Sequence, residues 1–600
     1  MTLLTPLLLV GVAELIARAL WPEGALPMFV EAPMGDGRYL VANRAVARRW
    51  FVREDTPPAP MLEPFAAQKP ARGFRVFVLG ESSTAGFPYP RNGAFSRVLR
   101  DMLRDVLPDD SVEVINLGIA ATNTYALVDI ADEVAAQSPD AVVIYAGHNE
   151  YYGALGAAST ENVVGSAPAL KRAYLRMLRS RLVLAMRRAL QPRGRARTGD
   201  VEAATLMETL ARTREIPLDG EIYQRGVRQF EGNLERVLRV FREDGVPVFV
   251  GSLASNIRDQ RPFPAPGNRG PSRAEGAFLD ARQALRAGDL GRARSLYERA
   301  RDLDVVRFRA PSAFNTVIRR VADAAGATYV PVAETATQRA RFGAPGEDLF
   351  LEHVHPNRDG YVLIASAFFE AFRAARFLGH AGRPERLRSP AEYRDGMHLT
   401  PFDERIVTHT VRTLTLRWPF VPVDRQRDYR GSYRPTSLLD SLSFAVSRGA
   451  SWETAKLRMA QAYEADAHYD SAAAEYRGLA RDAPLFEEPW RLLGRALLAG
   501  GHREEGERAF QRALEIAPTA EAANALATAA LQRRDLPRGI ALLRQSLDLQ
   551  PAQPDALHQL SMAYALAGDV ARARLTAAEL HRIAPSREGL AEWMQALGMR

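Results

Sequence analysis

The 600-residue chain contains no cysteine. This absence excludes disulfide bonds, cysteine metal sites and a thiol nucleophile. Lysine is also scarce, because only Lys69, Lys171 and Lys456 occur and all other basic residues are arginine or histidine. The net charge of +8 is modest for this length, and the sequence has no zinc-finger spacing, Walker glycine loop or stripe of aromatic and basic residues. We therefore expect no nucleic-acid partner.

The N-terminus carries an uncharged apolar run, but the run is short. Residues 3–13 have Thr5 as their only polar side chain, and Glu14 and Arg18 interrupt the continuation. No lysine or arginine precedes the run, unlike in a standard secretory signal. We expect residues 1–21 to form a signal anchor or transmembrane helix that holds the protein at a membrane, on the extracytoplasmic (periplasmic) side. The alternatives are an amphipathic helix packed on the next domain, and a soluble protein.

A chain of this length predicts several domains. Residues 22–70 are rich in proline and predict an irregular tether wrapped on the domain that follows. Residues 71–380 alternate short apolar runs with helical patterns, which indicates a parallel sheet covered by helices on both faces. The expected strands are Phe74–Leu79, Val112–Asn116, Ala141–Ala146, Val246–Gly251 and Ala327–Val332. The expected helices are Ala94–Leu107, Tyr125–Gln137, Tyr223–Glu243 and Ser312–Ala325.

Two helical insertions are expected within this domain. Residues 155–222 include a basic amphipathic helix and then an arginine-rich segment at 191–199. A solvated helix that covers the site is favoured over one that lies on a membrane surface. Residues 270–310 contain a pattern that resembles one helical hairpin of a tetratricopeptide (TPR) repeat.

The C-terminal quarter is repetitive. After a connector without clear period at residues 381–450, prolines recur at positions 484, 518, 551 and 585, in steps of 33 or 34 residues. TPR units have a 34-residue period, and Trp490 and Phe510 stand at offsets where such units place large packing residues. We therefore predict an all-α TPR solenoid over residues 451–600, with a degenerate third unit. Such an array suits a protein or peptide partner on its concave face.

Four segments at strand ends carry residues suited to chemistry. Ser82 follows the strand at 74–79 and precedes a helical segment, which is the placement that a nucleophilic serine needs. Gly118 and Asn149 follow the next two strands, and His355 lies in the loop Leu351–Asn357. Ligands bind at the carboxyl ends of parallel strands. Taken singly, each residue has a plainer interpretation as a helix cap, a turn or a structural loop residue.

This ordered set resembles the SGNH (GDSL-type) hydrolase superfamily over about residues 70–375. The resemblance implies a flavodoxin-like parallel five-stranded sheet and a serine esterase acting on carboxylic ester bonds, without cofactor or metal. It implies that Ser82 is the nucleophile, that His355 is the base and that Glu352 orients His355. The implied oxyanion hole consists of the backbone N–H groups of Ser82 and Gly118 and the side-chain amide of Asn149.

The sequence departs from the family pattern at three acidic positions, where Glu81, Glu150 and Glu352 replace aspartate. Glutamate can orient a triad histidine in other serine hydrolases, and Asp348 is a second candidate for this role. His353 is an alternative base. Two other functions stay open. Some SGNH members transfer acetyl groups to extracellular polysaccharides, and a decayed triad would leave a non-catalytic scaffold that acts through its TPR array.

Overall fold

The computed structural model describes residues 4–21, 24, 26–32, 37–51, 57–162, 164–165, 167–190, 206–211, 214–264, 272–379 and 382–599. Contacts within the chain separate two compact units. The first contains Met1–Met397 and Ile406–Arg434, and the second contains His398–Arg405 and Pro435–Arg600. The arginine-rich segment predicted at 191–199 lies outside the described residues.

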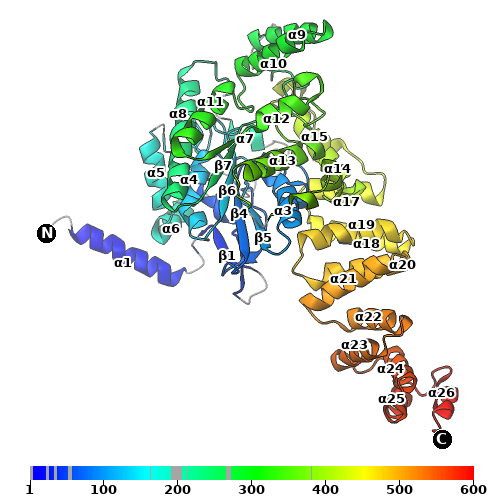
Figure 1. Cartoon of the computed structure of the whole chain (residues 1–600). Helices are drawn as coiled ribbons and strands as arrows, with labels where there is room; N and C mark the ends of the chain where they lie inside the picture. Colours follow the sequence, from blue (N-terminus) through cyan, green and yellow to red (C-terminus); the bar gives the residue numbers. More distant parts are fainter. Residues whose placement is uncertain are drawn as a thin grey trace. The chain divides into compact units, whose positions relative to one another are not determined.

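The first unit is built on a five-stranded parallel sheet (Figure 1). Its strands are β4 (Gly73–Gly80), β5 (Ser111–Asn116), β6 (Ala141–Tyr145), β7 (Val248–Gly251) and β8 (Thr328–Val330). The order across the sheet is β5-β4-β6-β7-β8, which is the flavodoxin-like order. β6 and β7 are buried along their whole length, as a sheet covered on both faces requires. All five predicted strands are confirmed.

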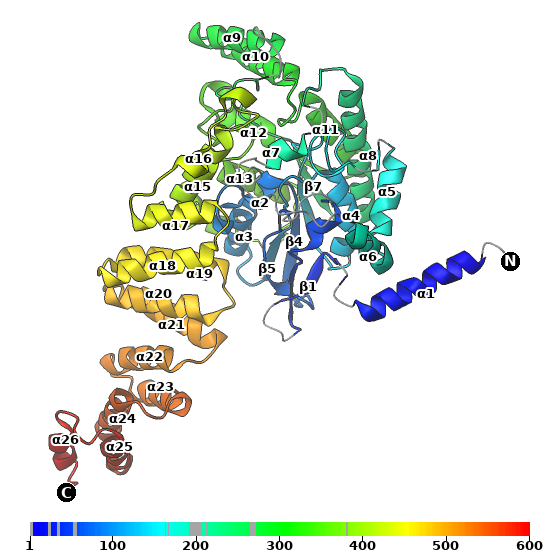
Figure 2. The ribbon, with the colours of Figure 1, turned by 180° about the vertical axis from the view of Figure 1, so that it is seen from behind.

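Helices cover both faces of the sheet. On one face lie α4 (Thr124–Ala135), α8 (Glu221–Glu243) and α11 (Ser312–Ala325). On the other lie α3 (Phe95–Val106) and α13 (Arg358–Ala374), with α12 (Val332–Arg339) packed beside α13 (Figures 1 and 2). Gly80 pairs with Tyr145 in the neighbouring strand. The loops after β4 and β6 therefore leave the sheet side by side, which brings two of the predicted site segments together.

The segment before the sheet is more ordered than the predicted irregular tether. It contains a three-stranded antiparallel sheet of β1 (Phe29–Glu31), β2 (Tyr39–Ala42) and β3 (Phe65–Ala66). The rings of Phe29 and Phe65 pack on Phe77 of β4. Trp50 is 1% exposed, and its Nε1 donates a hydrogen bond to Asp129 on α4. These aromatic side chains give the segment enough apolar surface to fold onto the domain.

The N-terminal helix α1 (Leu4–Leu20) does not support the predicted transmembrane anchor at residues 1–21. Among the described residues, no helix has both the length and the apolar character needed to cross a membrane. Glu14, in the last third of α1, accepts hydrogen bonds from the hydroxyl of Ser180 at 2.6 Å and the backbone N–H of Leu182 at 2.9 Å. The extracytoplasmic location stays a prediction, which fractionation of cells producing the full chain tests.

Both predicted insertions contain helices. The first contains α5 (Pro168–Met177), α6 (Arg181–Leu190) and α7 (Leu206–Leu210). The single basic helix predicted here is two helices, because Ser180 accepts a hydrogen bond from the N–H of Val183 and so caps α6. The second is the expected hairpin of α9 (Arg273–Arg286) and α10 (Leu290–Leu303). Phe278 and Tyr297 belong to the apolar core of this hairpin.

The predicted connector at 381–450 contains four α-helices. They are α14 (Pro390–Asp395), α15 (Pro401–Thr415), α16 (Tyr429–Ser432) and α17 (Leu438–Ser447). Four helical hairpins and a last helix follow, with the repeat length predicted for TPR units. The hairpins are α18 (Trp452–Ala465) with α19 (Tyr469–Asp482), α20 (Glu487–Ala499) with α21 (Arg503–Ile516), α22 (Ala520–Gln532) with α23 (Leu536–Leu549), and α24 (Pro554–Leu566) with α25 (Val570–Ile583); the last helix is α26 (Leu590–Ala596).

A buried lysine holds the first hairpin of the second unit in place. Lys456 on α18 is 0% exposed, and its Nζ lies 2.7 Å from Asp403 and 2.5 Å from Glu475 on α19. Trp452 donates its indole N–H to the other oxygen of Asp403 at 2.7 Å. The ammonium group of Lys456 thus compensates the charge of two buried carboxyl groups, those of Asp403 and Glu475.

Replacing Lys456 with methionine is expected to destabilise the second unit by about 3–5 kcal/mol, because removal of one partner leaves buried charge without compensation. Hydrogen exchange of α18 and α19 measures this loss as a local free energy of opening. Arg508→Ala is the matched control, since Arg508 pairs with Glu504 on an exposed surface, where ion pairs contribute about 0–1 kcal/mol. Equal protection in the wild type and the Lys456→Met variant would contradict this account.

Candidate active site

Ser82 lies at the first position of α2 (Ser82–Ala85), and only Glu81 separates it from the end of β4 at Gly80. Gly80 makes this placement possible, because a Cβ on Gly80 would lie 2.3 Å from the carbonyl oxygen of Tyr145 on β6. Thr84 then ties α2 to the same strand, since its hydroxyl donates to that carbonyl at 2.7 Å. Ser82 is half-buried, whereas the neighbouring Ser83 is buried and donates its hydroxyl to the carbonyl of Val354. Ser82 therefore has the accessible hydroxyl of the pair.

His355 faces Ser82 from a loop that precedes α13. The backbone N–H of Leu351 donates to the carbonyl of His355 at 2.9 Å and closes this loop. Asn357 ends the loop by capping α13, because its side chain accepts from the N–H of Gly360. The loop places His355 Nε2 at 2.8 Å from Ser82 Oγ. The imidazole can therefore accept the proton of the serine hydroxyl.

Glu352 joins two histidines. One carboxylate oxygen accepts a hydrogen bond from Nδ1 of His355, and the other accepts one from Nδ1 of His353. Burial alone would raise the pKa of Glu352, but both histidines hold it far below its ordinary value. Glu352 is thus an ionised acceptor that fixes the His355 tautomer with Nε2 free to face Ser82.

His353 does not take the position of the base. Its ring packs against those of Phe263, Phe308 and Phe420, and its Nδ1 is bonded to Glu352, whereas the ring that contacts Ser82 is that of His355. Burial lowers the pKa of His353, so a neutral ring donates to Glu352. Among the described residues, Glu352, His353 and His355 also form the group whose ligand atoms lie close enough for a metal ion. Here the three side chains satisfy one another by hydrogen bonding.

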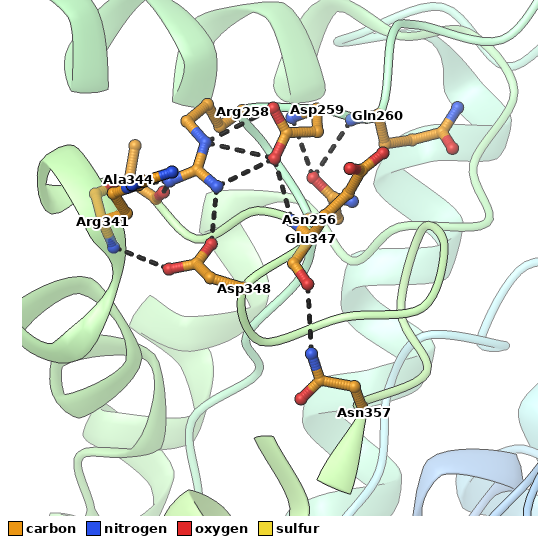
Figure 3. A network of polar contacts seen from close by, with 9 residues as sticks. All are labelled: Asn256, Arg258, Asp259, Gln260, Arg341, Ala344, Glu347, Asp348 and Asn357. Carbon is orange, nitrogen blue, oxygen red and sulfur yellow. Dashed lines mark hydrogen bonds and ion pairs between the residues drawn. The ribbon is translucent and has the colours of Figure 1, made fainter. Parts of the chain in front are cut away.

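Asp348, the other candidate for orienting His355, is engaged elsewhere. One of its oxygens lies 2.6 Å from the guanidinium of Arg258, and the other accepts the backbone N–H of Arg341 at 2.6 Å. Figure 3 shows Asp348 directed toward these two groups, within a network that also contains Asp259. Both oxygens of Asp348 therefore serve to hold the loop at 341–348, and Glu352 is the carboxylate that contacts His355.

Gly118 lies against α2, the helix that begins at Ser82. A Cβ on Gly118 would lie 2.4 Å from the backbone nitrogen of Ala85 in α2. The N–H of Gly118 donates at 2.8 Å to the side-chain oxygen of Asn116. Asn116 is fully buried, and its side-chain amide also donates to the carbonyl of Thr84 and the hydroxyl of Ser96. Asn116 is not among the site residues expected from the sequence, although a polar residue at the end of an apolar strand is a usable signal.

Gly118→Ala is expected to destabilise the first unit by about 1–3 kcal/mol, because the methyl group must displace the backbone of α2. The same displacement moves Ser82, so the rate of any reaction that uses its hydroxyl should fall as well. Thermal denaturation and turnover measure the two effects. Gly232→Ala is the matched control, because a Cβ at this helical position meets nothing within 4 Å. Equal behaviour of the two variants would contradict the close approach described here.

Asn149 is half-buried in the loop after β6, and its backbone N–H is bonded to Glu81. The adjacent His148 is bonded to another segment, because its Nδ1 accepts the N–H of Ala310 at 3.2 Å. Burial lowers the pKa of His148 to about 3, so this ring is neutral. The structure thus brings Ser82, His355 and Glu352 into one hydrogen-bonded chain, with Gly118 and Asn149 in the loops beside it.

Residues 78–363 match the model of the GDSL-like Lipase/Acylhydrolase family. This segment contains Ser82, Gly118, Asn149, Glu352 and His355, and it is a GDSL-like lipase/acylhydrolase domain. A search of curated proteins found no match to the chain.

Several solved structures resemble parts of the chain. Axe2, an acetylxylan esterase from Geobacillus stearothermophilus, is 14% identical, with 54% of this chain and 100% of that chain covered and a TM-score of 0.27. YrrB, a TPR protein with an unusual peptide-binding site, is 19% identical, with 26% and 84% covered and a TM-score of 0.23. MamA 41-end from Desulfovibrio magneticus RS-1 is 15% identical, with 32% and 99% covered and a TM-score of 0.23.

Proposed function

We propose that this chain, with its GDSL-like lipase/acylhydrolase domain, is a serine esterase that cleaves carboxylic esters through Ser82, His355 and Glu352. The observation that carries the proposal is the hydrogen-bonded sequence from Ser82 Oγ through His355 to Glu352. In this reaction Ser82 attacks the ester carbonyl while His355 accepts its proton. His355 then delivers the proton to the leaving alcohol, and water releases the acyl group from Ser82.

The oxyanion of the tetrahedral intermediate would be bound by the N–H groups of Ser82 and Gly118 and by the side-chain amide of Asn149. Each such donor typically accounts for about 100- to 1000-fold in rate. Because the N–H of Gly118 already donates to Asn116, this donor would have to be shared with the oxyanion or released by Asn116. Among the residues that the structure describes, the Ser82 N–H at the start of α2 donates no recorded hydrogen bond.

The test is a panel of esters with acyl chains of different length, assayed with the full chain and with Ser82→Ala as the blank. Turnover that depends on Ser82 supports the proposal, and its absence across the panel together with failure of a fluorophosphonate to label Ser82 contradicts it. Adding a sugar acceptor extends the test to acyl transfer. Appearance of the acyl group on the acceptor, instead of free acid, would assign a transferase.

We further propose that the helical hairpins of residues 451–600 bind a protein or peptide partner. The described hydrogen bonds of Ser82, His355 and Glu352 all come from the first unit, so a role for the hairpins outside the chemical step fits their sequence pattern. Hydrogen exchange of the full chain with a candidate peptide tests this proposal. Protection confined to residues 451–600 supports it, and protection confined to the first unit contradicts it.

A further inference from the structure

Glu81, the residue directly before Ser82, reaches across to the loop that carries Asn149. Glu81 stands at the N-cap position of α2, yet its side chain makes no cap hydrogen bond to that helix. Its two oxygens instead accept the backbone N–H of Gly147 at 3.0 Å and the backbone N–H of Asn149 at 3.1 Å. The side chain is buried, with a residue exposure of 2%. Both carboxyl oxygens are therefore used by alternate residues of one short loop.

The backbone of this loop is shaped so that its N–H groups can turn toward Glu81. Gly147 has a φ of +143°, and a Cβ there would lie 2.6 Å from a methyl group of Leu253. A side chain at this position would be strained and obstructed. The loop thus depends on a glycine at one end, and on Glu81 as the acceptor for two of its N–H groups.

A second buried carboxyl group holds the other side of Asn149. Glu150 is 0% exposed and accepts hydrogen bonds from the hydroxyl of Thr124 on α4 and the side-chain amide of Gln229 on α8. Asn149 is therefore held at two neighbouring points. Its own backbone N–H is bonded to Glu81, and the side chain of the next residue, Glu150, is bonded to α4 and α8. Among the described residues, no recorded hydrogen bond uses the Asn149 side-chain amide, so this amide is available to an oxyanion.

Two neighbouring buried carboxyl groups are costly for a fold. Burial and the charge of Glu150 raise the pKa of Glu81 to about 8, while the N–H groups of the loop oppose this rise. Burial raises the pKa of Glu150 to about 7. Buried polar groups of this kind are retained where they define one conformation of a site, and the conformation defined here is that of the loop beside the nucleophile.

We propose that Glu81 is a positioning residue that sets the side-chain amide of Asn149 for oxyanion binding and locks the Asn149 loop to the Ser82 turn. This inference rests on the proposed esterase function. Glu81 acts through the backbone of residues 147–149 and does not touch the substrate. It also accounts for glutamate at this position, because the side chain must span from β4 to the loop after β6 and meet two N–H groups at once.

The test compares Glu81→Gln and Glu81→Asp with the wild type in ester hydrolysis. Glutamine keeps one acceptor oxygen but turns an NH2 group toward the second backbone N–H. We expect kcat to fall roughly 10- to 100-fold, which is less than the loss caused by removing a whole oxyanion donor. KM should change no more than a few-fold, because the interaction strengthens in the transition state. Aspartate keeps both carboxyl oxygens and is one methylene shorter, so it should restore part of kcat.

A double-mutant cycle with Asn149→Ala separates this role from a general effect on the fold. When Asn149 has no amide, Glu81→Gln should cause little further loss of kcat, because both substitutions remove the same interaction. Glu113→Gln is the matched control. Glu113 on β5 also accepts a backbone N–H, from Ala66 at 2.7 Å, and it forms an ion pair with Arg75. Arg75 lies near the start of β4, whereas Glu81 follows the end of that strand. Glu113→Gln should lower stability without lowering kcat.

Three results would overturn the inference: an unchanged kcat in Glu81→Gln, losses that add fully in the cycle, or failure of both Glu81 variants to fold. The last result would make Glu81 a requirement of the fold alone. The proposed function fails separately, if the wild type shows no turnover that depends on Ser82. A wild type that needs Ser82 but is insensitive to Glu81→Gln leaves the esterase proposal standing and removes only the role assigned to Glu81.

Discussion

Ser82→Ala is expected to abolish both ester turnover and covalent labelling by a fluorophosphonate, with a fall in kcat on the order of 10⁶-fold, the size found when the serine of a catalytic triad is removed. The reason is geometric. The Ser82 hydroxyl lies 2.8 Å from His355 Nε2, and the hydroxyl of the neighbouring Ser83 is directed to the carbonyl of Val354 at 3.1 Å. The variant should keep the melting temperature of the wild type, because Ser82 is only half-buried.

Ser83→Ala is the matched control for this experiment. It removes a hydroxyl one residue away and one hydrogen bond to the loop that carries His355, so a modest loss of stability and a small loss of rate are expected. Labelling that persists in Ser82→Ala, or that disappears in Ser83→Ala instead, would move the nucleophile to Ser83. Mass spectrometry of the labelled peptide distinguishes the two serines directly.

The sheet and its covering helices were predictable because their signals are local. One fully buried run consists of Val76, Phe77, Val78 and Leu79, each 0% exposed. An apolar run of this length, followed by glycine and a helical pattern, is typical of a buried parallel strand. The small sheet before β4 has no such signal. Its strands have two to four residues, and its stability comes from contacts with distant residues such as Phe77.

The candidate site residues at the strand ends could be predicted from the sequence. The hydrogen bonds and ion pairs that connect their loops to distant residues could not. A strand followed by Ser82, Gly118 or Asn149 is visible in the sequence. The link from Glu81 to the N–H of Asn149 joins residues 68 positions apart, and the link from Asp348 to Arg258 spans 90 positions. Spacing alone therefore left Glu352 and Asp348 as alternatives, and the ion pair with Arg258 is the physical reason that Asp348 faces away from His355.

Glu352→Gln is expected to lower kcat strongly while the protein stays folded. In a Ser-His-Asp triad the corresponding amide substitution costs about 10⁴-fold, because the histidine is held in the wrong tautomer and loses the support of a negative charge. Here the cost should be somewhat smaller, since His353 also contacts the Glu352 carboxylate and keeps the side chain in place. Glu352→Asp should fall between the wild type and Glu352→Gln, and His355→Ala should be the most impaired.

Asp348→Asn provides the matched comparison, because it makes the same chemical change four residues earlier in the loop. Asp348 pairs with Arg258 and accepts the N–H of Arg341, so its loss should lower the melting temperature and leave kcat within a few-fold. The pKa of Glu352 is held far below its ordinary value, so this carboxylate should stay ionised in mildly acidic solution. Should Glu352→Gln turn over like the wild type while Asp348→Asn is inactive, the loop rearranges during catalysis and Asp348 orients His355.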